Sequence, residues 1–444
     1  MAKQANQDEI ALWNRSGRDH ITHINHLIEE MREGRDTPEE WPDDDRDAGL
    51  AARIIAAVEA AGRAEDWHEE APLADRAHEP LIPFFDGRAQ NLRCVTILGP
   101  DEFLLCPGSA MEPRATLHLK DGIVTERPDI LAVGSTCSHD LFVVATADAF
   151  TVSAALDAAP LYRYGWPDDV PPGALAQLDA AEDGRTLLFT VEDEWVWLGQ
   201  WTDEGVLWTR AYPDDAMVEL IAEEMSEEEW GEEEEVEWTD SMMHAALSPD
   251  GRFIAYGSQC YGHFIDRIDG TGQVRRWAQI GFRSEYPHNA CFSSDSDFAA
   301  LNSCHFYHGA TLAVRLEAVE GAVTPEYEES PLVTEIDAEL RVYASTWLPQ
   351  AAGLGAGGFA LAGAGDLVVT TPDGTLLTSF HFGSSASSID YCPKTGQLAV
   401  GSYSGFLHIY DPARGAEQGR TIGYRPLHER YRWVIWQDRA PFRW

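Results

Sequence analysis

Two Cys–His pairs are the side chains in this sequence whose types best suit a metal ion. Cys260 and His263 follow one predicted strand, and Cys304 and His308 follow the corresponding strand of the next repeat. Thiolates and imidazoles are the usual zinc ligands, and equivalent turns of neighbouring repeats can converge on one face. Their spacing matches no established zinc module, and Cys and His also occur in ordinary strands. Zinc at these residues is one hypothesis, and a protein without a cofactor is the other.

Residues 214–240 form the most acidic stretch of the sequence and contain neither Lys nor Arg. A run of like charges usually stays solvated as a loop. Acidic residues interleaved with tryptophan also occur in segments that bind a basic partner. The residues expected to do so here are Glu223, Glu224, Glu227, Glu228, Glu229, Trp230, Glu232, Glu233, Glu234, Glu235 and Trp238. The spacing of a calcium loop is missing, which argues against calcium. Both interpretations of the segment remain open.

The last residues of the chain, 424–444, are rich in Arg and Trp. Here Tyr431, Trp433 and Ile435 alternate with Arg432, Val434 and Trp436, a pattern typical of a strand. The favoured interpretation is a strand that closes the fold, because an unpaired sheet edge is a liability. The alternative is a docking surface, since Trp and Arg dominate binding hot spots. Its residues would be Trp433, Trp436, Arg439, Arg443 and Trp444.

Motifs of the common enzyme classes are missing from the sequence. There is no nucleophile elbow, no phosphate-binding glycine loop before a helix, and no His-Glu-x-x-His. This favours a protein without catalytic residues. The alternative is a metal-dependent hydrolase or lyase whose site carries no recognisable signature.

The charge of the chain limits its partners. Its 444 residues include 75 Asp and Glu against 32 Lys and Arg, a formal net charge of −43. Such a charge repels phosphate backbones, so neither nucleic acid nor an anionic membrane is expected as a ligand. A protein with a basic surface, simple solubility and adaptation to high salt all remain open. The Ala- and Arg-rich composition suggests a bacterial source.

The cysteines and the N-terminal sequence indicate the compartment. The seven cysteines are odd in number and scattered, which fits reduced thiols better than a disulfide framework. No apolar leader segment and no apolar run of membrane-spanning length is present. We therefore expect a cytoplasmic protein.

The first 75 residues are predicted to be helical, with an acidic linker. Apolar residues recur at helical spacing over 5–33, where Gly17 leaves two shorter helices possible, and an Ala-rich helix is expected over 47–63. From residue 80 to 444 the pattern changes to short strands and turns. The two parts are expected to be separate units.

A unit of three short strands recurs along this second part. Its best example is 388–411, where turns containing Pro393, Gly396 and Gly405 separate SIDYC, QLAVGS and FLHIYD. Seven such segments can be aligned, most of them forty to fifty-five residues apart. This is the period of a four-stranded propeller blade, and packing blades around an axis buries both faces of each.

Particular residues of these units resemble the WD40-like repeat. Leu247-Ser-Pro-Asp-Gly251 precedes a strand, and Val400-Gly-Ser402 is followed by Tyr410-Asp411, with Tyr where that family usually has Trp. The resemblance implies a mainly β, roughly seven-bladed propeller in which strands from both chain ends complete one blade. It also implies a platform for protein–protein interaction. We expect a non-enzymatic scaffold, and one form of it is an acidic bacterial regulator or immunity-type protein that binds a basic partner.

Overall fold

The computed structural model describes residues 5–35, 41–64, 67, 72–76, 81–84, 87–108, 112–168, 170–173, 175–191, 195–213, 244–258, 262–305, 308–416 and 419–444.

Two helices form the N-terminal region, α1 (Gln7–Arg32) and α2 (Ala48–Gly62). The Asn6 side chain accepts a hydrogen bond from the Glu9 N–H, and the Glu9 carboxylate accepts one from the Asn6 N–H. This capping box fixes the start of α1. The helix runs through Gly17 without a break. A Cβ atom at position 17 would lie 2.7 Å from Nη1 of Arg46, so glycine is needed there to let this guanidinium pack against the helix.

The first half of the remaining chain forms three antiparallel four-stranded sheets. Their strands are β1 (Leu92–Gly99), β2 (Glu102–Pro107), β3 (Thr116–Lys120) and β4 (Ile123–Arg127); β5 (Ala132–Ser135), β6 (Phe142–Ala145), β7 (Phe150–Ser153) and β8 (Tyr162–Tyr164); and β9 (Leu175–Ala180), β10 (Thr186–Val191), β11 (Trp195–Thr202) and β12 (Gly205–Tyr212). Each sheet is formed by strands consecutive in sequence, as expected of propeller blades.

The second half contains three further sheets. Two of them are formed by β13 (His244–Leu247), β14 (Phe253–Ser258), β15 (Gly262–Ile268), β16 (Val274–Ile280) and β20 (Val323–Thr324), and by β17 (Pro287–Phe292), β18 (Phe298–His305), β19 (His308–Arg315) and β21 (Val333–Asp337). The last contains β22 (Val342–Leu348), β23 (Gly358–Thr370), β24 (Leu376–Cys392), β25 (Gln397–Ser402), β26 (Phe406–Gly415), β27 (Gly423–Tyr424), β28 (Leu427–Val434) and β29 (Phe442–Arg443). Short 3-10 helices cover Ile82–Phe84, Leu316–Val319 and Gln350–Ala352.

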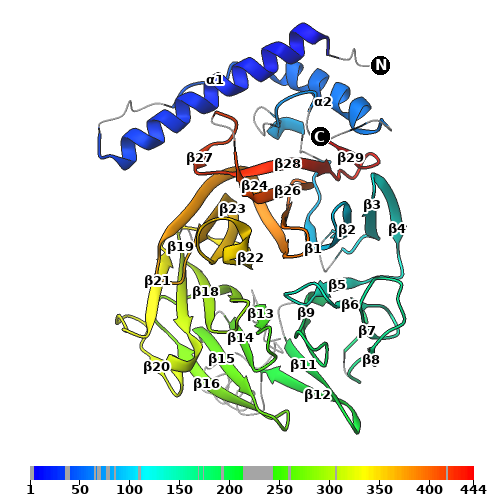
Figure 1. The fold of residues 1–444 in the computed structure, drawn as a ribbon, viewed down its shortest axis with the longest axis vertical. Helices are drawn as coiled ribbons and strands as arrows, with labels where there is room; N and C mark the ends of the chain where they lie inside the picture. Colours follow the sequence, from blue (N-terminus) through cyan, green and yellow to red (C-terminus); the bar gives the residue numbers. More distant parts are fainter. Residues whose placement is uncertain are drawn as a thin grey trace, which may run out of the picture.

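The first strand of each sheet faces a common centre (Figure 1). Strands β1, β5, β9, β13, β17, β22 and β24 contact one another in this order, and β24 returns to contact β1. The ring therefore closes, which confirms the predicted mainly β propeller with a small helical N-terminal region. Seven blades stays a prediction, because β24 pairs with β23 as far as Ser385 and with β25 from Ala386, so two groups of strands share one sheet.

The C-terminal residues form the outer strand of the last sheet. β28 pairs antiparallel with β26, and β29 pairs with β28. The strands β24, β25, β26 and β28 all come from the C-terminal part of the chain, so strands from both chain ends do not complete one blade here. The N-terminal helices instead cover this outer edge (Figure 1), and a buried apolar cluster joins α1 and α2 to the tail through Trp13, Ile54 and Trp444.

No helix among the described residues is long and apolar enough to cross a membrane.

Candidate functional site

The four residues predicted to bind zinc are not brought together as a site in the described structure. Cys260 lies outside the described residues. His263 is fully buried, with Nδ1 3.1 Å from the Ser284 hydroxyl, and Cys304 is buried, whereas His308 is exposed at the end of a hairpin. The part of the chain that the structure describes contains no cluster of three or more potential metal ligands.

His263 has a structural explanation. Its ring lies 5.3 Å from the ring of His244, centroid to centroid. Burial and the neighbouring His244 hold the pKa of His263 well below its ordinary value, so the imidazole stays neutral. It packs where the sheet containing β15 meets the sheet containing β17.

The tryptophans of the tail pack inside the protein. Trp433, Trp436 and Trp444 are buried, and the indole N–H of Trp444 donates to the Ala74 carbonyl at 2.9 Å. Arg439 donates to the Glu59 carboxylate of α2 at 2.8 Å. The guanidinium of Arg443 lies 4.6 Å from the Trp67 ring centroid. The tail is thus a docking surface for this chain's own N-terminal region, and its Trp side chains present no open face to a partner.

The predicted partner-binding residues between Glu223 and Trp238 lie outside the described residues. The strands that flank this segment in the sequence are described. β12 ends at Tyr212 on the outside of one sheet, and β13 begins at His244 beside the central channel. Tyr212 and His244 are both buried, so the chain is held in the ring before and after the segment.

A central channel runs between the inner strands and has a volume of about 570 Å3. Side chains two residues apart on a strand point the same way, so each inner strand places a pair of residues in its lining. These pairs include Cys94 and Thr96, Gln177 and Asp179, His244 and Ala246, Asn289 and Cys291, and Ser388 and Asp390. The channel is lined mainly by small and polar side chains.

Several lining groups bind the backbone of the next inner strand. The Gln177 side-chain oxygen accepts from the Ala245 N–H at 2.9 Å, and an Asp390 oxygen accepts from the Ile97 N–H at 2.7 Å. Through these hydrogen bonds the polar side chains hold neighbouring sheets together. A buried polar group costs free energy unless it is paired, so the lining contributes to ring closure.

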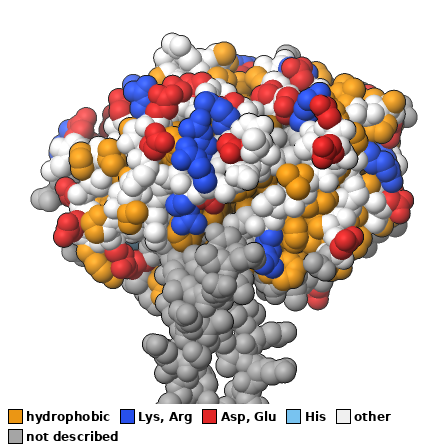
Figure 2. Space-filling model, turned by 90° about the horizontal axis from the view of Figure 1, so that it is seen from below, with side chains coloured by type: hydrophobic (Ala, Val, Ile, Leu, Met, Phe, Trp, Pro, Cys, Tyr) orange, Lys and Arg blue, Asp and Glu red, His pale blue; other side chains and the backbone are white. Residues whose placement is uncertain are grey.

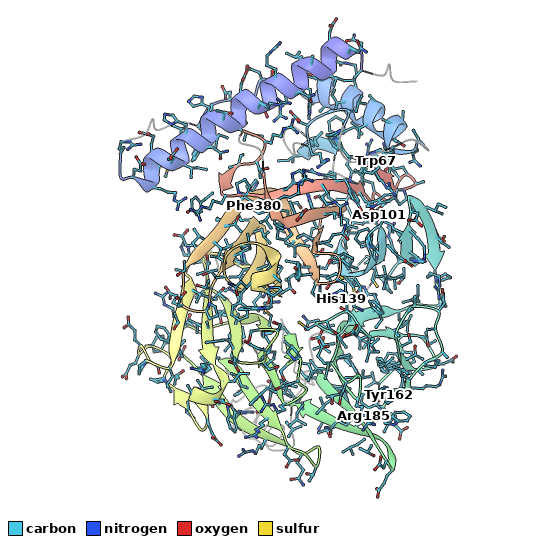
Figure 3. The ribbon with its side chains drawn as sticks, viewed as in Figure 1. Trp67, Asp101, His139, Tyr162, Arg185 and Phe380 are labelled. Carbon is cyan, nitrogen blue, oxygen red and sulfur yellow. The ribbon has the colours of Figure 1, made fainter. Side chains whose placement is uncertain are left out.

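His139 links the second sheet to the last one and is labelled near the centre of the ring in Figure 3. Its Nδ1 lies 2.9 Å from the Ile97 carbonyl oxygen, and its Nε2 lies 3.1 Å from Asp390. Burial alone would lower the pKa of His139, but the Asp390 carboxylate outweighs burial and raises this pKa to about 11. The ring is therefore an imidazolium that donates from both nitrogens.

Cys392 completes a Cys–His–Asp group without becoming a catalytic site. His139 lowers the pKa of the Cys392 thiol although burial opposes this. A thiol beside an imidazolium can be an activated nucleophile, so access to the sulfur decides whether Cys392 can act on a substrate. The Cys392 side chain is 2% exposed and does not line the channel, so a substrate there cannot reach the sulfur.

The other titratable groups of the channel are also unsuited to nucleophilic chemistry. Burial raises the pKa of the Cys137 and Cys291 thiols to about 12, so both stay protonated. Burial lowers the pKa of His288 to about 4 and raises that of Asp179 to about 6. Among the described channel residues, none forms an activated nucleophile with a neutral base.

Nothing in the sequence pattern indicates the His139–Asp390 pair. The two residues are 251 positions apart, and neither belongs to a motif. One signal was available in principle: Asp390 and Asp179 occupy equivalent positions on inner strands of a repeat, where a carboxylate is unusual. Finding its partner required the order of the sheets around the ring.

No protein-family model matches the sequence, and no curated protein matches it significantly. The structure is similar to the WD40 β-propeller domain of Doa1, with 13% identity over 75% of this chain and 96% of that chain and a TM-score of 0.46. It is also similar to the β-propeller domain of Myceliophteria thermophila Cps50 (Swd1), with 9% identity over 72% of this chain and 97% of that chain and a TM-score of 0.46. A third similar structure is KlHsv2 with loop 6CD replaced by a Gly-Ser linker, with 8% identity over 78% of this chain and 99% of that chain and a TM-score of 0.45. By its own sheet topology the chain has a β-propeller fold, and its repeat residues resemble the WD40-like pattern.

Proposed function

We propose that this protein is a non-enzymatic interaction scaffold of the cytoplasm that binds a basic protein through residues 214–240. The observation that carries the proposal is the placement of this acidic segment between β12 and β13, which belong to two different sheets of the ring. A closed ring is a rigid support, and loops carried by rigid supports often bind partners. A regulator or immunity-type protein that masks its basic partner is the specific form that we favour.

The charge of the segment, compared with that of the sheet that follows it, supports this assignment. On the sheet that follows it, Arg276 lies 2.6 Å from Asp266, and Arg252 also pairs with a neighbouring aspartate. Figure 2 shows Asp/Glu, Lys/Arg and hydrophobic side chains intermixed over this edge of the ring. The segment itself has only acidic charges. A field of one sign steers an oppositely charged partner and speeds association.

The channel chemistry favours binding over catalysis. Its thiols stay protonated, and His139 is held as a cation by Asp390. A cysteine is activated by a neighbouring base or by a lowered pKa, and the pKa values of Cys137 and Cys291 are raised instead. Polar side chains that line the described channel form hydrogen bonds between neighbouring inner strands and so stabilise the closed ring.

Affinity purification from the native host, with three forms of the chain as bait, tests the proposal. The first is the full-length protein, and the second lacks residues 214–240. The third, the neutral-segment variant, keeps the length of the segment and replaces every Glu in it with Gln and every Asp with Asn. The replaced residues are Asp214, Asp215, Glu219, Glu223, Glu224, Glu227, Glu228, Glu229, Glu232, Glu233, Glu234, Glu235, Glu237 and Asp240. We expect a basic protein to be recovered with the first form only and to bind again after purification of both proteins.

The outcomes separate binding by the segment from binding elsewhere. A partner that all three forms recover equally would contradict the role of the segment. Far-ultraviolet circular dichroism and the melting temperature of each form serve as folding controls. Adaptation to high salt predicts a different result: a melting temperature that rises steeply with NaCl as self-repulsion is screened, and no partner.

A further inference from the structure

A second cavity, of about 170 Å3, lies between α1 and the last sheet. Its wall comes from parts of the chain that are far apart in sequence: α1, the residues before α2, Arg76, and strands β24, β26 and β28. Liquid water occupies about 30 Å3 per molecule. The cavity therefore has room for several waters or for one small polyatomic anion.

Positive charge dominates the wall of this cavity. Four arginines line it, Arg46, Arg76, Arg420 and Arg432, together with two carboxylates, those of Asp44 and Glu429. With neutral histidines the wall has an excess of two positive charges. Just outside the wall, Asp75 pairs with Arg18 at 3.2 Å and lies 4.0 Å from Arg420, and Asp366 lies 3.2 Å from His381. The excess is thus a property of the residues that line the cavity. Such an excess stands out in a chain whose net charge is −43.

The two carboxylates are already bound by two of the arginines. Arg46 donates from Nε to an Asp44 oxygen at 2.9 Å. Arg432 donates to both oxygens of Glu429, at 2.8 and 2.7 Å. His408 also lies 2.9 Å from Glu429. Both carboxylates are therefore already engaged, Asp44 by Arg46 and Glu429 by Arg432 and His408.

Arg76 is the arginine left without a close counter-ion among the described residues. Its Nη atoms donate to the backbone carbonyls of Glu429 and Arg430, at 2.7 and 2.6 Å, whereas its nearest carboxylate oxygen is 4.0 Å away. Its side chain is 10% exposed. Burial lowers the pKa of Arg76, Glu429 partly offsets this, and the charge of Arg432 lowers it further.

Polar nitrogen atoms around the cavity have no hydrogen-bond partner in the described structure. They are Nε of Arg76, Nη1 of Arg46 and Nδ1 of His20. Arg46 is 4% exposed. A buried donor without a partner destabilises the fold, and an anion in the cavity would accept from the guanidinium donors.

We infer that this cavity is a binding site for a small phosphate anion, either free or as the phosphate group of a small molecule. Planar guanidinium groups match the oxygen geometry of phosphate and bind it with charge-assisted hydrogen bonds. The base of the site is buried, at Arg76 and Arg432, while the rim reaches solvent through Arg420 and His381, whose side chains are 38% and 45% exposed. Phosphate bound here would contact the N-terminal region and the propeller at once.

Isothermal titration of the full-length protein with sodium phosphate tests this site, against NaCl at equal ionic strength. We expect one saturable site. Arg420→Gln removes a rim charge at a partly exposed position and should weaken binding roughly tenfold, the effect of losing one charge-assisted hydrogen bond. Arg76→Gln removes the buried charge and should abolish binding. Arg275→Gln is the matched control, since this arginine is 56% exposed and pairs with Glu320 at 3.7 Å on another sheet.

Two results would overturn the inference. One is that phosphate gives no more heat or thermal shift than NaCl, and the other is that Arg420→Gln and Arg275→Gln bind phosphate with equal affinity. Glycerol 3-phosphate should bind at least as well as free phosphate if the ligand is a phosphate group on a small molecule. Tighter binding of succinate than of either would overturn the phosphate class. Deleting residues 214–240 should leave phosphate binding intact, so this test is independent of the proposed function.

Discussion

Nε2 of His139 lies 3.1 Å from a carboxylate oxygen of Asp390, and this pair joins the second sheet of the ring to the last. The other Asp390 oxygen accepts from the Ile97 N–H at 2.7 Å, so one carboxylate connects three consecutive sheets. Asp390 thus joins the last sheet to the first by a hydrogen bond and to the second by a largely buried ion pair.

Asp390→Asn should destabilise the ring strongly. The substitution leaves His139 buried without its counter-ion, and breaking a buried ion pair costs about 3–5 kcal/mol. Chemical denaturation of the full-length protein measures this loss. The matched control is Asp366→Asn, because Asp366 pairs with His381 at 3.2 Å where both side chains are more than 40% exposed. Equal losses in the two variants would show that the His139 pair does not stabilise ring closure.

The same pair should make stability depend on pH. The pKa of His139 in the folded protein, about 11, is above the ordinary value of 6.5. The contribution of the pair to the unfolding free energy is therefore fully present below pH 6.5 and is lost as the pH rises towards 11. The difference in unfolding free energy between the native protein and His139→Gln should therefore fall by about 1.4 kcal/mol per pH unit between pH 7 and 9. A difference that stays constant over this range would contradict a charged His139.

Asp179→Asn should stabilise the folded protein, whereas Asp390→Asn should destabilise it. Burial raises the pKa of Asp179 from 3.8 to about 6, so at neutral pH the folded protein holds an unfavourable buried charge. Asparagine can still accept a hydrogen bond from the Leu247 N–H. The variant should be more stable than the native protein at pH 7.5, by up to about 3 kcal/mol, and equally stable below pH 4. Asp148→Asn, at an exposed position, should change little at either pH, and a less stable Asp179→Asn at pH 7.5 would refute this view.

The Trp444 side chain should hold the N-terminal helices to the propeller. It is buried with Trp13 and residues of α2, and truncating a buried Trp to Ala costs about 3–5 kcal/mol. Trp444→Ala should accelerate hydrogen exchange in α1 and α2 more than in the inner strands. Trp41→Ala is the control, because Trp41 is 53% exposed. Unchanged exchange in both helices would mean that other contacts hold them.

The sequence predicted the elements that depend on local patterns. The strands expected in 388–411 correspond to the end of β24, β25 and β26, and the expected N-terminal helices correspond to α1 and α2. Turn residues and apolar periodicity act over a few positions, so one sequence is enough to find them. Gly17 lay beyond this local reasoning, because the guanidinium that explains it belongs to Arg46.

The polar sites depend on contacts between distant residues, and the sequence could not predict them. Arg76 meets Arg432 and α1 only when the N-terminal region folds onto the last sheet. The tryptophans of the tail showed the same limit. Their composition fits a hot spot for a partner, but Trp436 and Trp444 pack against the N-terminal region of the same chain, and Trp433 packs in the core between the first and last sheets.

The salt dependence of partner binding tests the central proposal most directly. With the captured partner purified, titration calorimetry at 50, 150 and 300 mM NaCl should show affinity falling steeply for the full-length protein, because salt screens attraction between exposed charges. The neutral-segment variant should bind weakly at every salt concentration. Tight binding that is the same at all three concentrations and in both proteins would contradict capture by residues 214–240.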